Sequence, residues 1–148
     1  MLPRITTQPS IIRRIVVGKS VGLVFGAMAY ASLSYLFANP DELLGIGLIL
    51  WYVTLGGVIG ISGVFNQHAI LVSPIPWWFR APVIGGWMNF VLTFFTYQQM
   101  EAVLVSLFGI ESKLSNPFWF VMEGAVVGLL IGFCATKAGG EGKETLDV

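Results

Sequence analysis

The sequence predicts an all-α, polytopic membrane protein built as a four-helix transmembrane bundle with glycine-zipper helix contacts. Of its 148 residues, 55% are hydrophobic and only 11% are charged, and the mean hydropathy is +0.80. Soluble domains usually carry about 25% charged residues. Several apolar runs also exceed the roughly 18 residues that indicate a membrane-spanning helix. Glycines recur every fourth residue in these runs, which is typical of closely packed membrane helices.

Four apolar segments follow one another in what we expect to be a single integral membrane domain, residues 1–148. We predict transmembrane helices at 15–37, 43–65, 81–108 and 118–136, a cytoplasmic interfacial segment at 66–80 and a polar C-terminal tail at 137–148. At about 1.5 Å per residue, each of the first two runs reaches about 34 Å, which is enough to cross a hydrocarbon core of about 30 Å. Backbone groups find no water there, so these segments should be helical.

The first apolar run could also be read as part of a signal or transit peptide, because the first forty residues contain arginines and no acidic residue. The run from Ile15 to Phe37 has 23 residues, whereas the apolar core of a signal peptide has roughly 7–15. We therefore expect an uncleaved first transmembrane helix.

The third segment has two interpretations. As one helix from Ala81 to Ile110 it would measure about 45 Å and would need a strong tilt. Alternatively, the span ends near Glu101, and residues 102–116 form an interfacial or re-entrant piece on the outer side. The stretch at residues 66–82 contains three prolines, Pro74, Pro76 and Pro82. Because proline blocks helix continuation, we expect an irregular stretch at the cytoplasmic interface.

The distribution of basic residues predicts the topology. With four spans, seven of the eight cations fall on one side, namely Arg4, Arg13, Arg14, Lys19, Arg80, Lys137 and Lys143. Only Lys113 falls on the other side. Because basic residues favour the cytoplasmic side, both termini should be cytoplasmic. A bacterial inner membrane fits this pattern, and a mitochondrial one is also compatible with it.

Three residues at the start of the third segment have the character of membrane-interface anchors. Trp77 and Trp78 match the aromatic belt of a membrane protein, and Arg80 could extend its charge to the headgroups.

Glycines at intervals of four are the most specific signal in the chain. Such spacing keeps them on one helix face, and membrane helices associate where backbones approach closely. The candidate packing positions are Gly18, Gly22 and Gly26 in the first segment, Gly56, Gly60 and Gly63 in the second, and Gly124, Gly128 and Gly132 in the last. These faces either pack the four helices of one chain together or present at least one surface to another copy or a partner.

Carboxylates inside apolar segments are the candidate functional groups. Glu101 and Glu123 lie equally far before and after the turn between the last two helices, so continuous helices would place them at the same depth. Two like charges in low dielectric do not both ionise easily. With Gln98, Tyr97 and Asn89 they are candidates for binding an ion, a proton or a partner's cation. Alternatively, both carboxylates simply reach the outer headgroups.

One stretch resembles a known family in part. "TFFTYQQMEAVLV" at 93–105, followed by a glycine-containing helix, is similar to the third and fourth helices of small four-helix fluoride channels. The resemblance covers about a third of the chain. The first helix lacks the arginine that follows the glycines in that family, and the second lacks its embedded asparagine, so no residue role is transferred.

The functional expectations follow from what the sequence contains. No catalytic constellation, phosphate-binding loop or metal-ligand cluster is visible, the single His68 and Cys134 have no paired ligand, and the zero net charge gives no signal for nucleic acid. We therefore expect a non-enzymatic protein without cofactor or metal. Its partners would be the lipid bilayer and either other membrane subunits or further copies of itself. The first hypothesis is an accessory subunit of a larger membrane complex, whose polar tail is held by a neighbour. The alternative is a small oligomeric ion or proton channel that uses the outer-half carboxylates.

Overall fold

The structure, a computed structural model, describes residues 8–65 and 75–146, and these residues are helical without any strand. The elements are α1 (Ile11–Leu36), α2 (Glu42–Ser62), α3 (Trp77–Phe95), α4 (Tyr97–Phe108), η1 (Lys113–Ser115), α5 (Trp119–Gly139) and η2 (Lys143–Leu146). Of these, α1, α2 and α5 are each long and apolar enough to span a membrane. Helices α3 and α4 would together form a fourth span, but they are bent by 100° relative to each other. The cytoplasmic segment expected at 66–80 lies mostly outside the described residues.

Polar side chains determine where the first two helices begin. Ser10 accepts a hydrogen bond from the backbone N–H of Arg13 at 3.4 Å, and Asp41 accepts one from Leu44 at 3.1 Å. Such side chains satisfy backbone donors that the first turn leaves unpaired. Helix α1 therefore begins at Ile11, ahead of the apolar run expected from residue 15, and α2 follows Asp41 directly.

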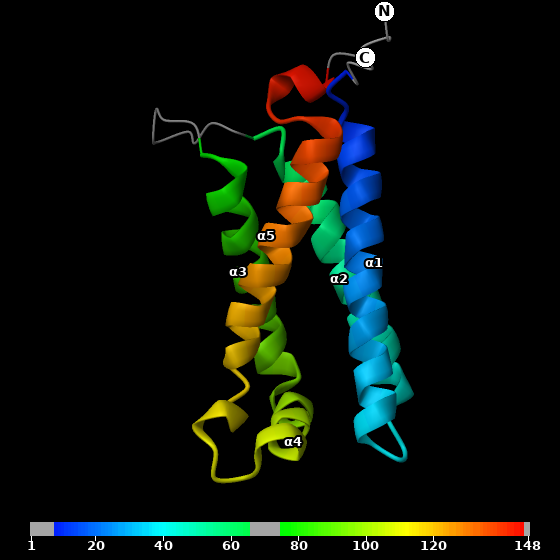
Figure 1. Ribbon diagram of the computed structural model, residues 1–148, viewed down its shortest axis with the longest axis vertical. Coiled ribbons are helices and arrows are strands. Elements are labelled where there is room, and N and C mark those ends of the chain that lie inside the picture. Colours follow the sequence, from blue (N-terminus) through cyan, green and yellow to red (C-terminus); the bar gives the residue numbers. More distant parts are fainter. Residues whose placement is uncertain (1–7, 66–74, 147–148) are drawn as a thin grey trace, which may run out of the picture.

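The long helices form two antiparallel pairs. Helix α1 packs along α2, and α3 packs along α5, while α5 also contacts α1 and α2. Figure 1 shows the start of α1 and the end of α5 at one end of the bundle, with α4 at the opposite end. The main core cluster joins the pairs through Leu55 and Ile59 of α2, Ala81 of α3, and Val127 and Ile131 of α5.

All nine glycines of the expected packing faces lie against helices of the same chain. A Cβ added at Gly26 would lie 2.6 Å from the Cα of Ile49, and one at Gly18 would overlap the backbone of Gly56. In the second pair, a Cβ at Gly128 would lie 2.5 Å from the carbonyl oxygen of Ala81. These distances are shorter than any real contact, so the close approach within each pair depends on the missing side chains.

The third segment is interrupted, as in the second interpretation, but earlier than near Glu101, because α3 ends at Phe95 and α4 follows at a bend of 100°. At Thr96 the backbone turns to φ −122° and ψ 22°, and both the backbone N–H and the hydroxyl of this residue donate to the carbonyl of Leu92, at 3.0 and 2.9 Å. At this residue α3 ends, and α4 begins at Tyr97 in a new direction. The aromatic rings of Phe94 and Tyr97, on either side of the break, pack against Phe118, with ring centroids 5.7 and 6.1 Å from that of Phe118.

The C-terminal tail is held by its own chain. Helix α5 continues to Gly139, beyond the expected end at 136, and Gly140 then adopts a φ of +74°, which glycine tolerates. The N–H of Gly142 donates to the carbonyl of Gly63 at 2.8 Å, and the N–H of Ser10 donates to that of Gly139 at 2.9 Å. The described part of the tail, up to residue 146, therefore closes over the end of the bundle.

Candidate functional site

A carboxylate lies within the bundle at Glu123 of α5, where three helices meet. The hydroxyl of Tyr52 on α2 lies 2.9 and 2.8 Å from its two oxygens. The side-chain N–H of Asn89 on α3 donates to Oε2 at 2.7 Å. A phenol has a single hydrogen to donate, so the two Tyr52 distances describe one hydrogen bond shared between both oxygens.

Asn89 is itself fixed by its surroundings. It is fully buried, donates also to the carbonyl of Phe120 at 3.0 Å, and accepts from the indole Nε1 of Trp51 at 3.1 Å. An indole nitrogen is only a donor, so the amide oxygen must face Trp51 and the amide nitrogen must face Glu123. The indole thereby determines that Asn89 donates to the carboxylate.

Gly124 explains why a glycine follows this glutamate directly. A Cβ at Gly124 would lie 2.6 Å from the Cβ and the Cγ of Asn89. The side chain of Asn89 therefore crosses the bare backbone of α5 to reach the carboxylate. The glycine face and the carboxylate network are parts of one arrangement.

A cavity of about 550 Å³ adjoins the network between α1, α2, α4 and α5. Its lining residues are Phe25, Met28, Ala29, Ser32, Leu33, Leu36, Leu44, Leu48, Tyr52, Met100, Val103, Leu104, Leu107, Phe120, Glu123, Val126 and Val127. Apart from Ser32, the polar lining consists of Tyr52 and Glu123, the two members of the network. Met28, Leu107 and Val126 are more than half exposed, so the cavity reaches the surface of the bundle. Ligand pockets commonly measure about 300–1,000 Å³ and are mostly apolar with a few polar groups.

The network compensates for part of the cost of placing a carboxylate in a membrane. A charged side chain costs about 2.5–3.5 kcal/mol on insertion scales at the centre of a spanning helix, which is an upper bound for Glu123 in the second turn of α5. A hydrogen bond to a charged group contributes about 1.5–3 kcal/mol in soluble proteins, and the average in membrane proteins is about 0.6 kcal/mol. Across the described ranges the only ion pair is Arg80–Glu141, so the carboxylate has neutral donors but no neighbouring cation there.

Of the five candidate residues from the sequence, the structure brings together only Asn89 and Glu123. Glu101, Gln98 and Tyr97 lie exposed on α4, and none of them is hydrogen-bonded to Glu123 in the described part of the chain. The two glutamates would lie at equal depth only if Glu101 belonged to a helix that continued straight across the bundle. The break at Thr96 redirects α4, which carries Glu101, so this condition is not met. Sequence reasoning missed Tyr52, although its position in the middle of an apolar segment was a usable signal.

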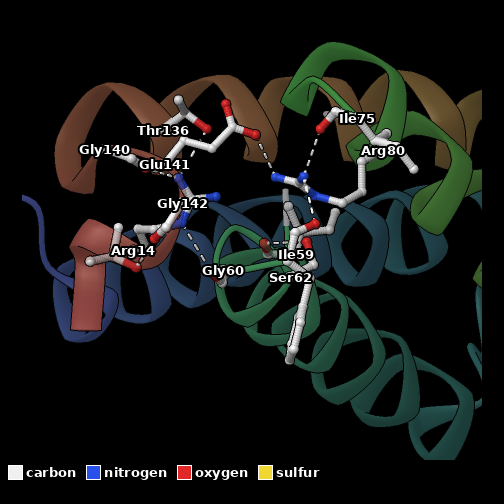
Figure 2. Close-up of polar contacts among 12 residues, drawn as sticks. Arg14, Ile59, Gly60, Ser62, Ile75, Arg80, Thr136, Gly140, Glu141 and Gly142 are labelled. Carbon is white, nitrogen blue, oxygen red and sulfur yellow. Dashed lines mark hydrogen bonds and ion pairs between the residues drawn. The ribbon is translucent and has the colours of Figure 1, made fainter. Parts of the chain in front are cut away.

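A second polar cluster, around Arg14, lies at the end of the bundle where α1 begins and α5 ends, and Figure 2 shows its contacts. The guanidinium of Arg14 is almost fully buried. It donates to the carbonyl of Gly60 and to the hydroxyl of Thr136, both at 3.1 Å, and also to the carbonyl of Gly140. Arg14 thus joins α1 to α2 and to the end of α5, whereas its sequence position indicated only a cation for topology.

Arg80 lies beside this cluster and contacts the tail. Its guanidinium pairs with Glu141 at 2.7 Å and donates to the carbonyls of Phe65 and Ile75 at 3.1 and 2.9 Å. The side chain is only 11% exposed, so it binds its own chain, in contrast to the expected extension to the headgroups. Of the other expected anchors, Trp78 is exposed, while Trp77 packs against Phe133 at 5.8 Å.

Neither a similarity to known proteins nor a cluster of metal ligands in the described residues assigns a role to this site. No family model matches the chain, and neither a curated protein nor a solved structure matches it. Within residues 8–65 and 75–146, no group of three or more His, Cys, Asp or Glu side chains could hold a metal ion. His68 lies outside the described residues.

Proposed function

We propose that the chain is a non-enzymatic integral membrane protein whose cavity beside Glu123 binds a lipid-soluble ligand. The observation that carries this proposal is the cavity of about 550 Å³, which is lined by apolar side chains and contains one carboxylate. Its size and its lining are typical of ligand sites. Its exposed rim at Met28, Leu107 and Val126 would admit a molecule directly from the bilayer.

The proposed location is a bacterial inner membrane with both termini in the cytoplasm. The described cations Arg13, Arg14, Lys19, Arg80, Lys137 and Lys143 belong to the half of the bundle in which α1 begins and α5 ends. Lys113 lies in η1, at the other end. The positive-inside rule then assigns the first end to the cytoplasm. The cavity, which contacts α4, would open in the outer half of the bilayer.

The geometry favours this function over the two hypotheses from the sequence. An accessory subunit that docks through its glycine faces would have to separate helices that those glycines already join. An ion path requires polar groups along its length. The cavity offers Ser32, Tyr52 and Glu123 among apolar residues, which suits a hydrophobic molecule better than a hydrated ion.

The test is to fill the cavity and measure binding of single-tailed amphiphiles. Ala29 of α1 lines the cavity, whereas Ala27 of the same helix is exposed and does not line it. Native mass spectrometry from detergent would count dodecanol and dodecylamine molecules bound to each protein. We expect saturable binding of at least one of these probes to the wild type and to Ala27→Trp, and its loss in Ala29→Trp. Absence of saturable binding to the wild type, or equal binding to both variants, would overturn the proposal.

A further inference from the structure

We infer that the ligand of this cavity is a cationic amphiphile, with an ammonium head on Glu123 and one apolar tail along the cavity. This inference rests on the proposed function and specifies its ligand class. It is carried by the unfilled hydrogen-bonding capacity of the carboxylate, by its lack of a cationic partner and by the position of both features in an apolar cavity.

The carboxylate has room for a further donor. An ionised carboxylate offers about four lone-pair positions. Tyr52 supplies one hydrogen, shared between the two oxygens, and Asn89 supplies another. Asn89 uses its remaining donor capacity on the carbonyl of Phe120. Because Glu123 lines the cavity, a donor that enters from that side meets an acceptor the protein leaves incompletely used.

The charge of the carboxylate selects among donors. The ion pair of the described residues, Arg80–Glu141, lies in the cluster at the opposite end of the bundle. In the low dielectric of a membrane, opposite charges attract far more strongly than in water, and charged groups within membranes usually pair. An ammonium head would supply the missing partner. A carboxylate or phosphate head would be repelled, since no cation lines the cavity.

The remaining lining suits the other parts of such a molecule. Phe25, Phe120 and the ring of Tyr52 line the cavity with the carboxylate, and aromatic faces attract cations. The other lining residues are almost all apolar, and Met28 and Leu107 among them are more than half exposed. A single hydrocarbon tail would lie against these side chains while the head stays on the carboxylate.

Three probes of equal chain length test the head group on the intact protein. Dodecylamine is cationic at neutral pH, because alkyl ammonium groups of the lysine type lose their proton near pH 10; dodecanol is neutral and dodecanoate is anionic. Native mass spectrometry would measure the affinity of each for the wild type, Glu123→Gln and Glu101→Gln. The last variant is the matched control, because Glu101 is an exposed carboxylate on α4.

We expect the wild type and Glu101→Gln to bind dodecylamine about 30-fold more tightly than dodecanol. This ratio corresponds to about 2 kcal/mol, the smallest usual cost of removing one partner of a buried charge pair. Glu123→Gln should lose this preference, and Glu123→Asp, which keeps the charge, should retain part of it. The preference within the wild type does not depend on whether any variant folds.

The possible outcomes distinguish the cationic head group from the proposed binding of a lipid-soluble ligand, on which it rests. Equal binding of dodecanol and dodecylamine to the wild type, with loss in Ala29→Trp, would overturn the cationic head and leave the cavity as a ligand site. Stronger binding of dodecanoate would overturn the inference as well. Absence of saturable binding by all three probes would remove the proposed function itself.

Discussion

Tyr52 and Glu123 join the two helix pairs of the bundle through one phenol hydroxyl, which lies 2.8 and 2.9 Å from the carboxylate oxygens. Tyr52 belongs to α2, the partner of α1, and Glu123 belongs to α5, the partner of α3. The hydrogen bond from Trp51 to Asn89 makes a parallel connection between α2 and α3. The polar network thus fastens the two pairs together beside the cavity.

Removing the Tyr52 hydroxyl should weaken this connection. In Tyr52→Phe the carboxylate keeps only Asn89 as a donor, and we expect the free energy of unfolding to fall by roughly 0.6–3 kcal/mol, between membrane-protein averages and soluble-protein values for charged hydrogen bonds. Thermal unfolding in detergent would measure the change. Tyr35→Phe is the control, because Tyr35 is 90% exposed. Equal melting temperatures for both variants would refute the role of the hydroxyl.

Replacing a glycine of the packing face by alanine should lower stability, whereas replacing a glycine without neighbours should raise it. An added Cβ at Gly26 would lie 2.6 Å from the Cα of Ile49, whereas one at Gly47 would meet nothing within 4 Å. Gly26→Ala should destabilise the protein by about 1–3 kcal/mol through overpacking. Gly47→Ala should stabilise it by up to about 1 kcal/mol, because alanine favours helices. Melting temperatures that shift in the same direction would contradict this account of the packing.

Much of the helical framework was predictable because it depends on local pattern. Long apolar runs indicated α1, α2 and α5, the three helices that are long and apolar enough to span a membrane. The break at Thr96 was not predictable in the same way. The break coincides with the packing of Phe94 and Tyr97 against Phe118, which is distant in sequence, and such a contact leaves no periodic signal.

The candidate site was only partly predictable for a related reason. Glu123 and Asn89 stand out as polar residues in apolar segments, and both belong to the network. Glu101 stands out equally, yet it is exposed on α4. The sequence distance of each glutamate from the turn gave no information about the bend at Thr96, which precedes Glu101 and redirects α4. Tyr52 was overlooked because a tyrosine in an apolar run has no evident partner until the helices are placed together.

Replacing Arg14 should lower the free energy of unfolding far more than replacing its neighbour Arg13. Arg14 is 1% exposed and donates to oxygens of α2 and of the α5 end, whereas Arg13 is exposed. Arg14→Gln should lower the free energy of unfolding by at least about 2 kcal/mol, because hydrogen bonds from a charged group are lost and buried carbonyls remain unpaired. Arg13→Gln should change it by less than about 0.5 kcal/mol. Thermal unfolding of the two variants checks this, and a similar loss in both would mean that Arg14 contributes only its charge.

The ion pair between Arg80 and Glu141 should stabilise the C-terminal tail modestly. The two side chains are 11% and 24% exposed and 2.7 Å apart, so the pair is partly shielded from water. A double-mutant cycle with Arg80→Gln and Glu141→Gln should give a coupling energy of roughly 0.5–1 kcal/mol, toward the upper part of the range for accessible pairs. Because salt screens accessible charges, the coupling should decrease in 1 M salt, at which the Debye length is about 3 Å.

Arg80→Gln alone should lower the free energy of unfolding more than Glu141→Gln alone, since Arg80 also donates to the carbonyls of Phe65 and Ile75. A coupling energy near zero at low salt would show that the tail is held by its backbone bonds to Gly63 and by the burial of Thr145, without help from this pair.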